Sequence, residues 1–351
     1  MIIKYKHNPI IIPENIKTVN DEVEIFGVFN PGATKYKNKI ILLLRVALKP
    51  KAENGWIKVL IADKNNDYKL KILKWKKLKS LKVISNDVRF IDINDQRYLT
   101  SLSVFYLAQS DDGLNFSISE KPVFLPAKDY EIFGIEDPRI TRIKDRYFIT
   151  YTAVSENGFC SAVASTKDFI SFDRLGIIFP PENKDVVLFP KKINKKYYAL
   201  HRPTNSFIGK PSIWISESED LIHWGNHQIL LTPLNNKWER IKIGAGPEPK
   251  LTEKGWLVLY HSCGDKGMYS MNTILLDRNS PNRILGKSKQ PVLIPQFNYE
   301  RKGVVSNVVF SNGWIELNEK LLIYYGSADK YVAVAEASIY SILKKISAIK
   351  N

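Results

Sequence analysis

The chain has 351 residues, of which 44% are hydrophobic and 11% aromatic, and this composition excludes an intrinsically disordered protein. Its net charge of +16 at neutral pH would suit a nucleic acid, an anionic membrane or an anionic substrate. No apolar run reaches about 18 residues, so we expect no transmembrane helix and no membrane partner.

The N-terminal stretch MIIKYKHNPIIIPEN contains only short apolar pieces, interrupted by His7, Pro9 and Pro13. It lacks the apolar core and the small-residue cleavage site of a signal peptide. The two cysteines, Cys160 and Cys263, offer neither a disulfide framework nor the spacing of a metal site. We therefore expect a reducing, cytoplasmic location, no metal and no cofactor.

Short strands dominate the rest of the chain, because β-branched and aromatic runs recur between turn residues. Each of six phrases has a short strand, a charged or glycine-containing turn, and a second strand rich in Tyr or Leu. In chain order they are FNPGATKYKNKIILLLRVAL from Phe29, NDVRFIDINDQRYLTSLS from Asn86, EDPRITRIKDRYFITYTA from Glu136, FPKKINKKYYALHRP from Phe189, PEPKLTEKGWLVLYHS from Pro247 and SNVVFSNGWIELNEKLLIYYGSA from Ser306. A period of roughly 50 to 60 residues predicts an all-β propeller. An amphipathic helix is expected only in the tail SIYSILKKISAIK.

In a propeller the first strand of each blade lines the central channel, so polar residues at corresponding positions should converge on one axis. The residues concerned are Asn30, Asp87, Arg89, Asp137, Arg139, His201, Arg202, Glu248 and Asn307. The alternative is that they form ion pairs that hold the blades together. The adjacent acids Glu136 and Asp137 in GIEDPRIT could likewise form a turn, pair with Arg139 or donate a proton in catalysis.

The densest basic stretch, KLKILKWKKLKSLK at residues 69–82, alternates apolar and basic residues as a solvated hairpin or edge strand does. An anion-binding patch is the competing interpretation. No zinc-finger, RRM or KH signature accompanies it, so we expect no nucleic-acid partner.

Several longer motifs resemble the blade motifs of glycoside hydrolase family 130. They are GIEDPRIT, VFNPGA, KDVVLFPKKINKKYYALHRP, DLIHWGNH, IGAGPEPKLTEKGWLVLYH and YYGSAD. They occur in the family's order along the chain, and the resemblance spans roughly residues 8–340. The resemblance implies a single five-bladed β-propeller over residues 1–351 that acts on β-mannosides. The N-terminal strands would close the last blade, and residues 338–351 would form a tail.

The resemblance also implies an inverting mechanism with one protein acid, Asp137, which protonates the glycosidic oxygen through a hydroxyl of the mannosyl ring. In the family's phosphorylases inorganic phosphate attacks C1 and releases α-mannose 1-phosphate. The expected partners are therefore an oligosaccharide and phosphate, and a homo-oligomer is compatible with this. The remaining substrate-binding residues that the resemblance implies are Asn30, Arg45, Asp87, Arg89, Glu136, Arg139 and Asp329.

Phosphate would be held by Lys242, where family phosphorylases have a phosphate-contacting cation, and by His201 and Arg202. The sequence departs from the phosphorylase pattern at SLSVFYLA and at Glu156, which stands near a phosphorylase arginine. A carboxylate there would suit a β-mannosidase, with Glu156 as the base that activates water. The sequence is also compatible with a propeller glycosidase active on arabinans or fructans, and with a non-catalytic carbohydrate-binding propeller.

Overall fold

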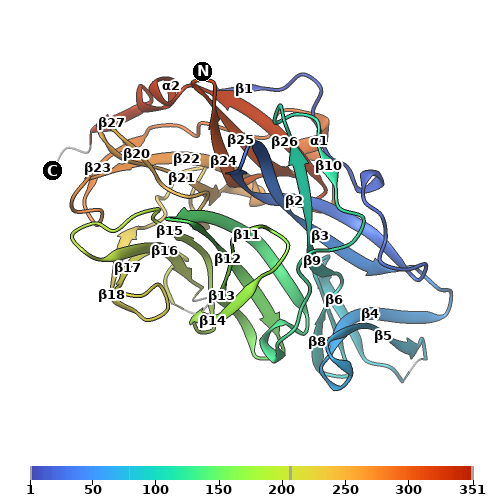
Figure 1. Cartoon of the computed structure of the whole chain (residues 1–351). Helices are drawn as coiled ribbons and strands as arrows, with labels where there is room; N and C mark the ends of the chain where they lie inside the picture. Colours follow the sequence, from blue (N-terminus) through green and yellow to red (C-terminus); the bar gives the residue numbers. More distant parts are fainter. Residues whose placement is uncertain (1, 79, 205–207, 349–351) are drawn as a thin grey trace.

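The computed structural model describes residues 2–78, 80–204 and 208–348, and these residues form an all-β protein (Figure 1). Helices are short: α1 (Asn298–Arg301), α2 (Ile339–Leu343) and the 3-10 turns η1 (Pro13–Asn15), η2 (Lys64–Asn66), η3 (Asp129–Glu131) and η4 (Asp265–Gly267). None of the helices in the described ranges is long and apolar enough to cross a membrane.

The strands form five antiparallel units that follow one another along the chain. Unit 1 consists of β2 (Val23–Tyr36), β3 (Lys39–Pro50), β9 (Leu102–Ser110) and β10 (Ser117–Ile118). Unit 2 consists of β11 (Gly134–Ile143), β12 (Arg146–Ser155), β13 (Gly158–Thr166) and β14 (Asp173–Phe179). Units 1 and 2 belong to one continuous sheet, in which they are joined by a parallel pairing of Gly134 with Ser103.

The remaining units are separate sheets. Unit 3 consists of β15 (Asn183–Leu188), β16 (Tyr197–Pro203), β17 (Ile213–Ser218) and β18 (Trp224–Leu231). Unit 4 consists of β19 (Lys242–Ala245), β20 (Lys250–Thr252), β21 (Gly255–Cys263), β22 (Tyr269–Leu276), β23 (Ile284–Ser288) and β27 (Ile346–Ala348). Unit 5 consists of β24 (Val309–Leu317), β25 (Lys320–Ser327), β26 (Tyr331–Ala337) and β1 (Ile3–Lys4).

Both ends of the chain add outer strands to these units. N-terminal β1 pairs with β26 through Ile3 opposite Glu336 and Lys4 opposite Ala335. Near the other end, β27 pairs with β23, and α2 lies between β26 and β27 in the chain. Residues 349–351 of the predicted tail lie outside the described residues.

Five apolar clusters join each unit to the next, and one of them joins unit 5 to unit 1. Leu44 and Tyr106 of unit 1, for example, share a cluster with Tyr324 of unit 5. Leu43 of unit 1 shares the next cluster with Tyr151 of unit 2. The apolar alternation of the strands therefore buries both faces of every unit, because each unit lies between two others.

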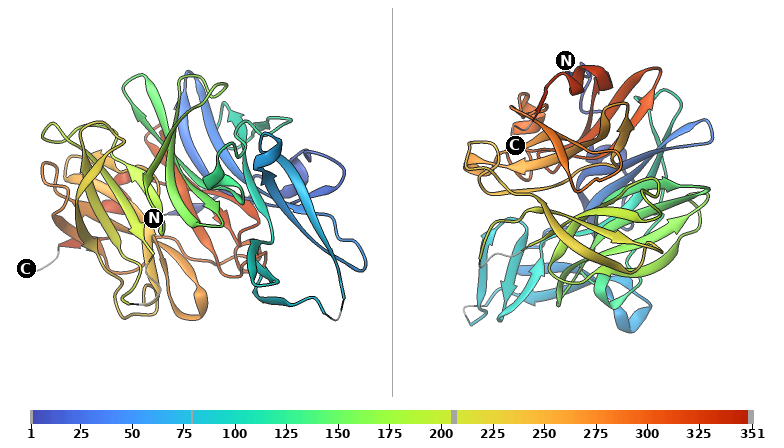
Figure 2. Two further views of the ribbon diagram at one scale, coloured as in Figure 1. Left: turned by 90° about the horizontal axis from the view of Figure 1, so that it is seen from below. Right: turned by 90° about the vertical axis from the view of Figure 1, so that its left-hand side faces the viewer.

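Two small sheets are inserted between β3 and β9 and project from one edge of the molecule (Figures 1 and 2). One is the hairpin of β4 (Trp56–Asp63) and β5 (Lys69–Lys76), and the other contains β6 (Val83–Asp87), β7 (Phe90–Ile93) and β8 (Gln96–Leu99). Lysines alternate along β5 with half-buried Leu70 and Ile72, and the described lysines of this stretch are exposed. This arrangement favours the solvated-hairpin interpretation; Lys79 lies outside the described residues.

A buried glutamate precedes the inner strand in units 2, 4 and 5, and each follows an aromatic residue in the sequence. Its carboxylate accepts a hydrogen bond from a tyrosine on the next strand and pairs with a cation on an outer strand. The three sets, which we call the glutamate clasps, are Glu131 with Tyr151 and Arg174, Glu239 with Tyr260 and Lys287, and Glu300 with Tyr325 and Lys4.

Candidate active site

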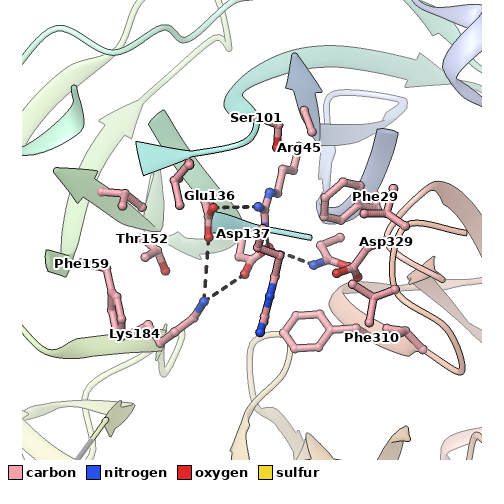
Figure 3. A pocket seen from close by; sticks show the side chains of 18 of the residues that line it. Phe29, Arg45, Ser101, Glu136, Asp137, Thr152, Phe159, Lys184, Phe310 and Asp329 are labelled. Atoms are coloured by element: carbon pink, nitrogen blue, oxygen red, sulfur yellow. Dashed lines mark hydrogen bonds and ion pairs between the residues drawn. The ribbon is translucent and has the colours of Figure 1, made fainter. Parts of the chain in front are cut away.

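A cavity of about 300 Å³ opens where the inner strands of the units meet (Figure 3). All five units contribute lining residues, and the small β6–β8 sheet contributes one wall. Figure 3 shows Asp137, Glu136 and Lys184 facing one another across this space, with Asp329 and Phe310 on the opposite side. A recess built from distant parts of the chain is the usual position of a ligand site.

Three inner strands break their register at an Asn or Asp that lines the cavity. The pairing shifts between Phe29 and Gly32 in β2, between Glu136 and Arg139 in β11, and between Lys184 and Val187 in β15. The residues in these bulges with left-handed backbone are Asn30 (φ 48°), Asp137 (φ 53°) and Asp185 (φ 58°). Asn and Asp tolerate this conformation better than other side chains, and a bulge re-aims a side chain, here into the cavity.

The carboxylate of Asp137 is buried, and its two oxygens have different surroundings. Oδ1 accepts hydrogen bonds from Asn30 Nδ2 at 2.9 Å and from Arg45 Nη1 at 2.8 Å. Oδ2 faces Lys184, whose Nζ lies 3.7 Å away. Burial alone would raise the pKa of Asp137, but the cations Arg45, Lys184 and Arg139 outweigh burial and hold this pKa below its usual range. The cavity without ligand therefore contains an ionised Asp137.

Arg45 fixes both adjacent acids. Its Nη2 donates to Glu136 Oε1 at 2.7 Å, its Nε donates to Ser103 Oγ at 3.0 Å, and its guanidinium lies over the Phe29 ring. A guanidinium group that binds two carboxylates at once restricts their positions more than a single ammonium group does. Glu136 Oε2 remains directed towards the cavity, 3.9 Å from Lys184 Nζ.

A further carboxylate, Asp329, follows β25 and lines the cavity opposite Asp137. Burial raises the pKa of Asp329 to about 6, against the opposing effect of Arg45. Arg89 of the small sheet also lines the cavity and binds Asp87 through Nε at 2.9 Å and Nη2 at 2.6 Å. These hydrogen bonds lower the pKa of Asp87 to about 2. Carboxylates and guanidinium groups in this arrangement suit the hydroxyl groups of a sugar.

A group of cations lies at the unit 3 and unit 4 side of the cavity. Arg202 Nη1 lies 2.8 Å from Asp185 Oδ2, and Lys242 and His261 also line the space. Burial, and then Arg202, lower the pKa of Lys242 to about 8. The buried Asp185 is shared between Arg202 and Arg139, so one carboxylate offsets several cations. The region has surplus positive charge and is suited to bind an anion.

The tautomer of His261 follows from its neighbours. Arg202 Nη1 lies 3.1 Å from His261 Nε2, and a guanidinium can only donate, so Nε2 is the acceptor. Burial lowers the pKa of His261 to about 3, so the ring is neutral and carries its proton on Nδ1. Gly244 gives this ring its space, because a Cβ there would collide with Asp185 Oδ2 and with the ring itself.

Polar groups without partners concentrate around the cavity. Among the described residues, eight buried side-chain polar atoms have no hydrogen-bond partner. Six of them belong to cavity-lining residues, namely Asn30, Thr152, Asp185, Arg202, Thr204 and His261, although the atom of Asp185, Oδ2, does form the ion pair with Arg202. Buried polar groups are normally paired, so this concentration indicates a site organised for a polar ligand. The described residues contain no cluster of His, Cys, Asp and Glu that could hold a metal ion.

Most of the predicted site residues meet in this cavity. Those that line it are Asn30, Arg45, Arg89, Glu136, Asp137, Arg202, Lys242 and Asp329. Asp87 stands behind Arg89 as its ion-pair partner. Of the remaining polar residues predicted to converge, Glu248 and Asn307 are not among the lining residues.

His201 and Arg139 also lie outside the cavity wall. His201 is buried on the opposite face of β16 from Arg202, since adjacent strand residues point to opposite faces, and it stacks on Phe179. Arg139 is buried behind the cavity, where it donates to the carbonyl oxygens of Gly246 and Ala245. Neither His201 nor Arg139 is among the residues that line the cavity, so the phosphate contact of His201 and the sugar contact of Arg139 stay predictions.

Glu156, the predicted base of a hydrolase, is exposed in the turn between β12 and β13 and is not among the residues that line the cavity.

The cavity-lining residues that were not predicted from the sequence include Lys184, Asp185 and His261. All three lie within motifs that carry the family resemblance, KDVVLFP and LVLYH. The repeat offered a signal for Asp185, because the inner strand of unit 3 is NKDVVL, and the phrase beginning at Phe189 starts after that strand.

Comparisons with known proteins agree with a carbohydrate-active site. A family model described as beta-1,4-mannooligosaccharide phosphorylase matches residues 98–348. A beta-1,2-mannobiose phosphorylase from Listeria innocua serovar 6a is 41% identical over 349 residues, which cover 98% of each chain. A 1,2-beta-oligomannan phosphorylase from Thermoanaerobacter sp. (strain X514) is 36% identical over 242 residues, 68% of this chain and 80% of that protein. The solved structure of beta-1,2-mannobiose phosphorylase from Listeria innocua with beta-1,2-mannobiose superposes with a TM-score of 0.93, at 40% identity and 98% coverage of each chain.

Proposed function

This chain belongs to glycoside hydrolase family 130, and from that premise we propose that it is an inverting phosphorylase of β-mannosides. The observation that carries the proposal is one cavity that combines a buried acid, Asp137, with the cations Arg202, Lys242 and Lys184. Surplus positive charge is what a phosphate dianion requires, whereas water needs a carboxylate base instead.

The preferred substrate in this proposal is β-1,2-mannobiose. Its support is the similarity over nearly the whole chain to a beta-1,2-mannobiose phosphorylase. A cavity of about 300 Å³ is at the small end of ligand sites, and that size suits a short oligosaccharide.

In the reaction, a phosphate oxygen attacks C1 of the mannosyl residue from the face opposite the β-bond, and the bond from C1 to the aglycone oxygen breaks. Asp137 supplies the proton that the aglycone oxygen takes, through a hydroxyl of the mannosyl ring. Attack from the opposite face inverts the anomeric carbon, so the product is α-mannose 1-phosphate. Asn30, Arg45 and Asp329 hold the mannosyl hydroxyl groups, and Arg202 and Lys242 hold phosphate.

The proposed architecture for this chemistry is a five-bladed β-propeller with the five units as blades. Its support is the series of apolar clusters, which pack each unit on the next and unit 5 on unit 1. We also propose a cytoplasmic location, in which the buried thiols of Cys160 and Cys263 stay reduced. Cell fractionation tests the location, and light scattering tests whether the protein forms a homo-oligomer.

Incubation with β-1,2-mannobiose and with β-1,4-mannobiose, each with and without phosphate, tests the proposal. We expect phosphate-dependent mannose 1-phosphate, formed faster from the β-1,2-linked sugar. Free mannose released equally well without phosphate would contradict phosphorolysis. Faster cleavage of the β-1,4-linked sugar would contradict only the linkage.

A further inference from the structure

Lys184 lies between the acid and the cation group. It belongs to β15, directly before Asp185, and its ammonium faces Asp137 Oδ2 at 3.7 Å and Glu136 Oε2 at 3.9 Å (Figure 3). Both distances exceed hydrogen-bond length, so the ammonium attracts the two acids without being locked to either. The side chain is 21% exposed, which leaves it room to move in the cavity.

The oxygen that Lys184 faces is the one available for proton transfer. Asp137 Oδ1 already accepts from Asn30 and Arg45, whereas within the described residues Oδ2 accepts no hydrogen bond and forms an ion pair with the ammonium. An ionised carboxylate cannot donate a proton, so Asp137 needs a change in its surroundings before it acts as an acid. The charged and polar groups that face Asp137 from all neighbouring elements are Asn30, Arg45, Glu136, Arg139, Lys184 and Asp329.

The charge of Lys184 also acts on Lys242, which is proposed to bind phosphate together with Arg202. After burial and Arg202, it is among the cations that lower the pKa of Lys242 to about 8. A phosphate dianion bound by Arg202 and Lys242 would therefore compete with Asp137 for the same ammonium. Arg45 is not free to respond in this way, because two carboxylates and Ser103 hold its guanidinium.

We propose that Lys184 couples phosphate binding to protonation of the acid: it neutralises Asp137 in the empty cavity and turns to phosphate when phosphate binds. The inference rests on the proposed phosphorolysis. Once Lys184 has turned, Asp137 Oδ2 takes up a proton from solvent and passes it, through a hydroxyl of the mannosyl ring, to the aglycone oxygen as the bond from C1 to that oxygen breaks. The new bond joins C1 to a phosphate oxygen, and the proton of the hydrogen phosphate is released to solvent, so the one proton that Asp137 takes up is balanced by one proton released in each turnover.

The test compares Lys184→Met, which removes the charge at similar length, with Lys184→Arg, which keeps it. Lys192→Met, at an exposed lysine of the same unit, is the matched control for loss of one charge. For Lys184→Met we expect the KM for phosphate to rise roughly tenfold to a hundredfold, with the KM for β-1,2-mannobiose little changed. We also expect the alkaline limb of kcat/KM for β-1,2-mannobiose at low phosphate, which reports the free enzyme, to move to higher pH, because less positive charge then opposes the proton on Asp137.

Lys184→Arg keeps the charge, so its pH profile should have the same alkaline limb as that of the wild type. If Lys184→Met does not fold, Lys184→Gln replaces it in the test. If the KM for phosphate rises in Lys184→Met but the alkaline limb of its pH profile stays at the wild-type pH, the coupling is overturned, since Lys184 would then be only a phosphate ligand. A moved limb with an unchanged phosphate KM overturns it as well, since Lys184 would then only tune Asp137. Absence of phosphate-dependent product from the wild-type protein contradicts the proposed function instead, independently of the variants.

Discussion

Asp137 has to be ionised in the empty cavity and protonated when it acts. Its contacts with Arg45 and Lys184 account for the first condition, and the negative charge of bound phosphate provides for the second. In the proposed mechanism, Asp137 is therefore an acid whose protonation depends on the cosubstrate. This is the reason that a low pKa in the ligand-free protein is compatible with acid catalysis.

Replacement of this acid gives the first prediction. Asp137→Asn keeps the size of the side chain and a carbonyl oxygen for Asn30 and Arg45, but it removes the transferable proton. We expect kcat to fall by about 10²–10⁴-fold, as for loss of a general acid in enzymes of this kind, with a native circular dichroism spectrum. Asp145→Asn, in the exposed turn after the same strand, is the control. A variant that retained most of the wild-type kcat would exclude Asp137 as the acid.

Lys242 gives a prediction about pH. Its pKa is lowered to about 8, so in the free enzyme it is charged below that pH and neutral above it. Because only the charged form attracts phosphate, kcat/KM for phosphate should fall as the pH rises through about 8. Arginine stays charged, so Lys242→Arg should move this fall to higher pH. An identical profile in wild type and variant would show that Lys242 does not control phosphate binding.

The sequence identified most residues that carry charge into the cavity, but not the direction of every side chain. His201 and Arg202 are adjacent and both basic, and only the alternation of β16 decides that Arg202 faces the cavity and His201 the sheet interior. Arg139 illustrates a second limit. Its partners are the Asp185 carboxylate and the carbonyl oxygens of Gly246 and Ala245, and no pattern of side chains indicates the contacts with carbonyl oxygens.

At the scale of the element, a bulge in the inner strand is the device that repeats. Asn30, Asp137 and Asp185 occupy it in units 1, 2 and 3, and each turns a polar side chain into the cavity. The repeat is recognisable in the sequence, but the strand at which each unit starts is not. In unit 3, for example, the phrase that starts at Phe189 begins after the inner strand β15. The start of each unit depends on which strand is innermost, and the packing of one unit against the next decides which strand that is.

The glutamate clasps are a second repeated element, and the pairs Tyr130-Glu131, Trp238-Glu239 and Tyr299-Glu300 mark them in the sequence. The clasp at Glu300 binds Lys4 Nζ at 2.8 Å, Tyr325 Oη at 2.8 Å and the backbone N–H groups of Gln296 and Phe297. It thus fastens the N-terminal strand β1 and the segment before α1 to β25.

Loss of this clasp should destabilise the protein without affecting the chemistry. Glu300→Gln leaves Lys4 without a charged partner, so we expect the free energy of unfolding to fall by about 1.5–3 kcal/mol. Urea unfolding measures this, with Glu316→Gln on the exposed face of β24 as the control. Unchanged stability in Glu300→Gln would contradict a structural role for the clasp. A changed KM for phosphate would contradict the expectation that the clasp does not affect the chemistry of the cavity.

For the molecule as a whole, five units of similar strand content supply different groups to one cavity. Units 1 and 2 provide Asn30, Arg45 and Asp137, whereas units 3 and 4 provide Arg202, Lys242 and His261. The sequence predicted the all-β class and the repeat from local patterns. It did not predict the shared counter-ion Asp185 or the position of Lys184 between the two halves, because both depend on the approach of different units.

The most direct measurement is ³¹P and ¹H NMR of wild-type protein with β-1,2-mannobiose and inorganic phosphate. We predict that the phosphate signal decreases as an α-configured mannose 1-phosphate signal grows, with one mannose released for each phosphate consumed. Mannose formed without loss of phosphate would contradict phosphorolysis, because the cations of the cavity would then not serve that reaction. A β-configured sugar phosphate would contradict the inverting attack.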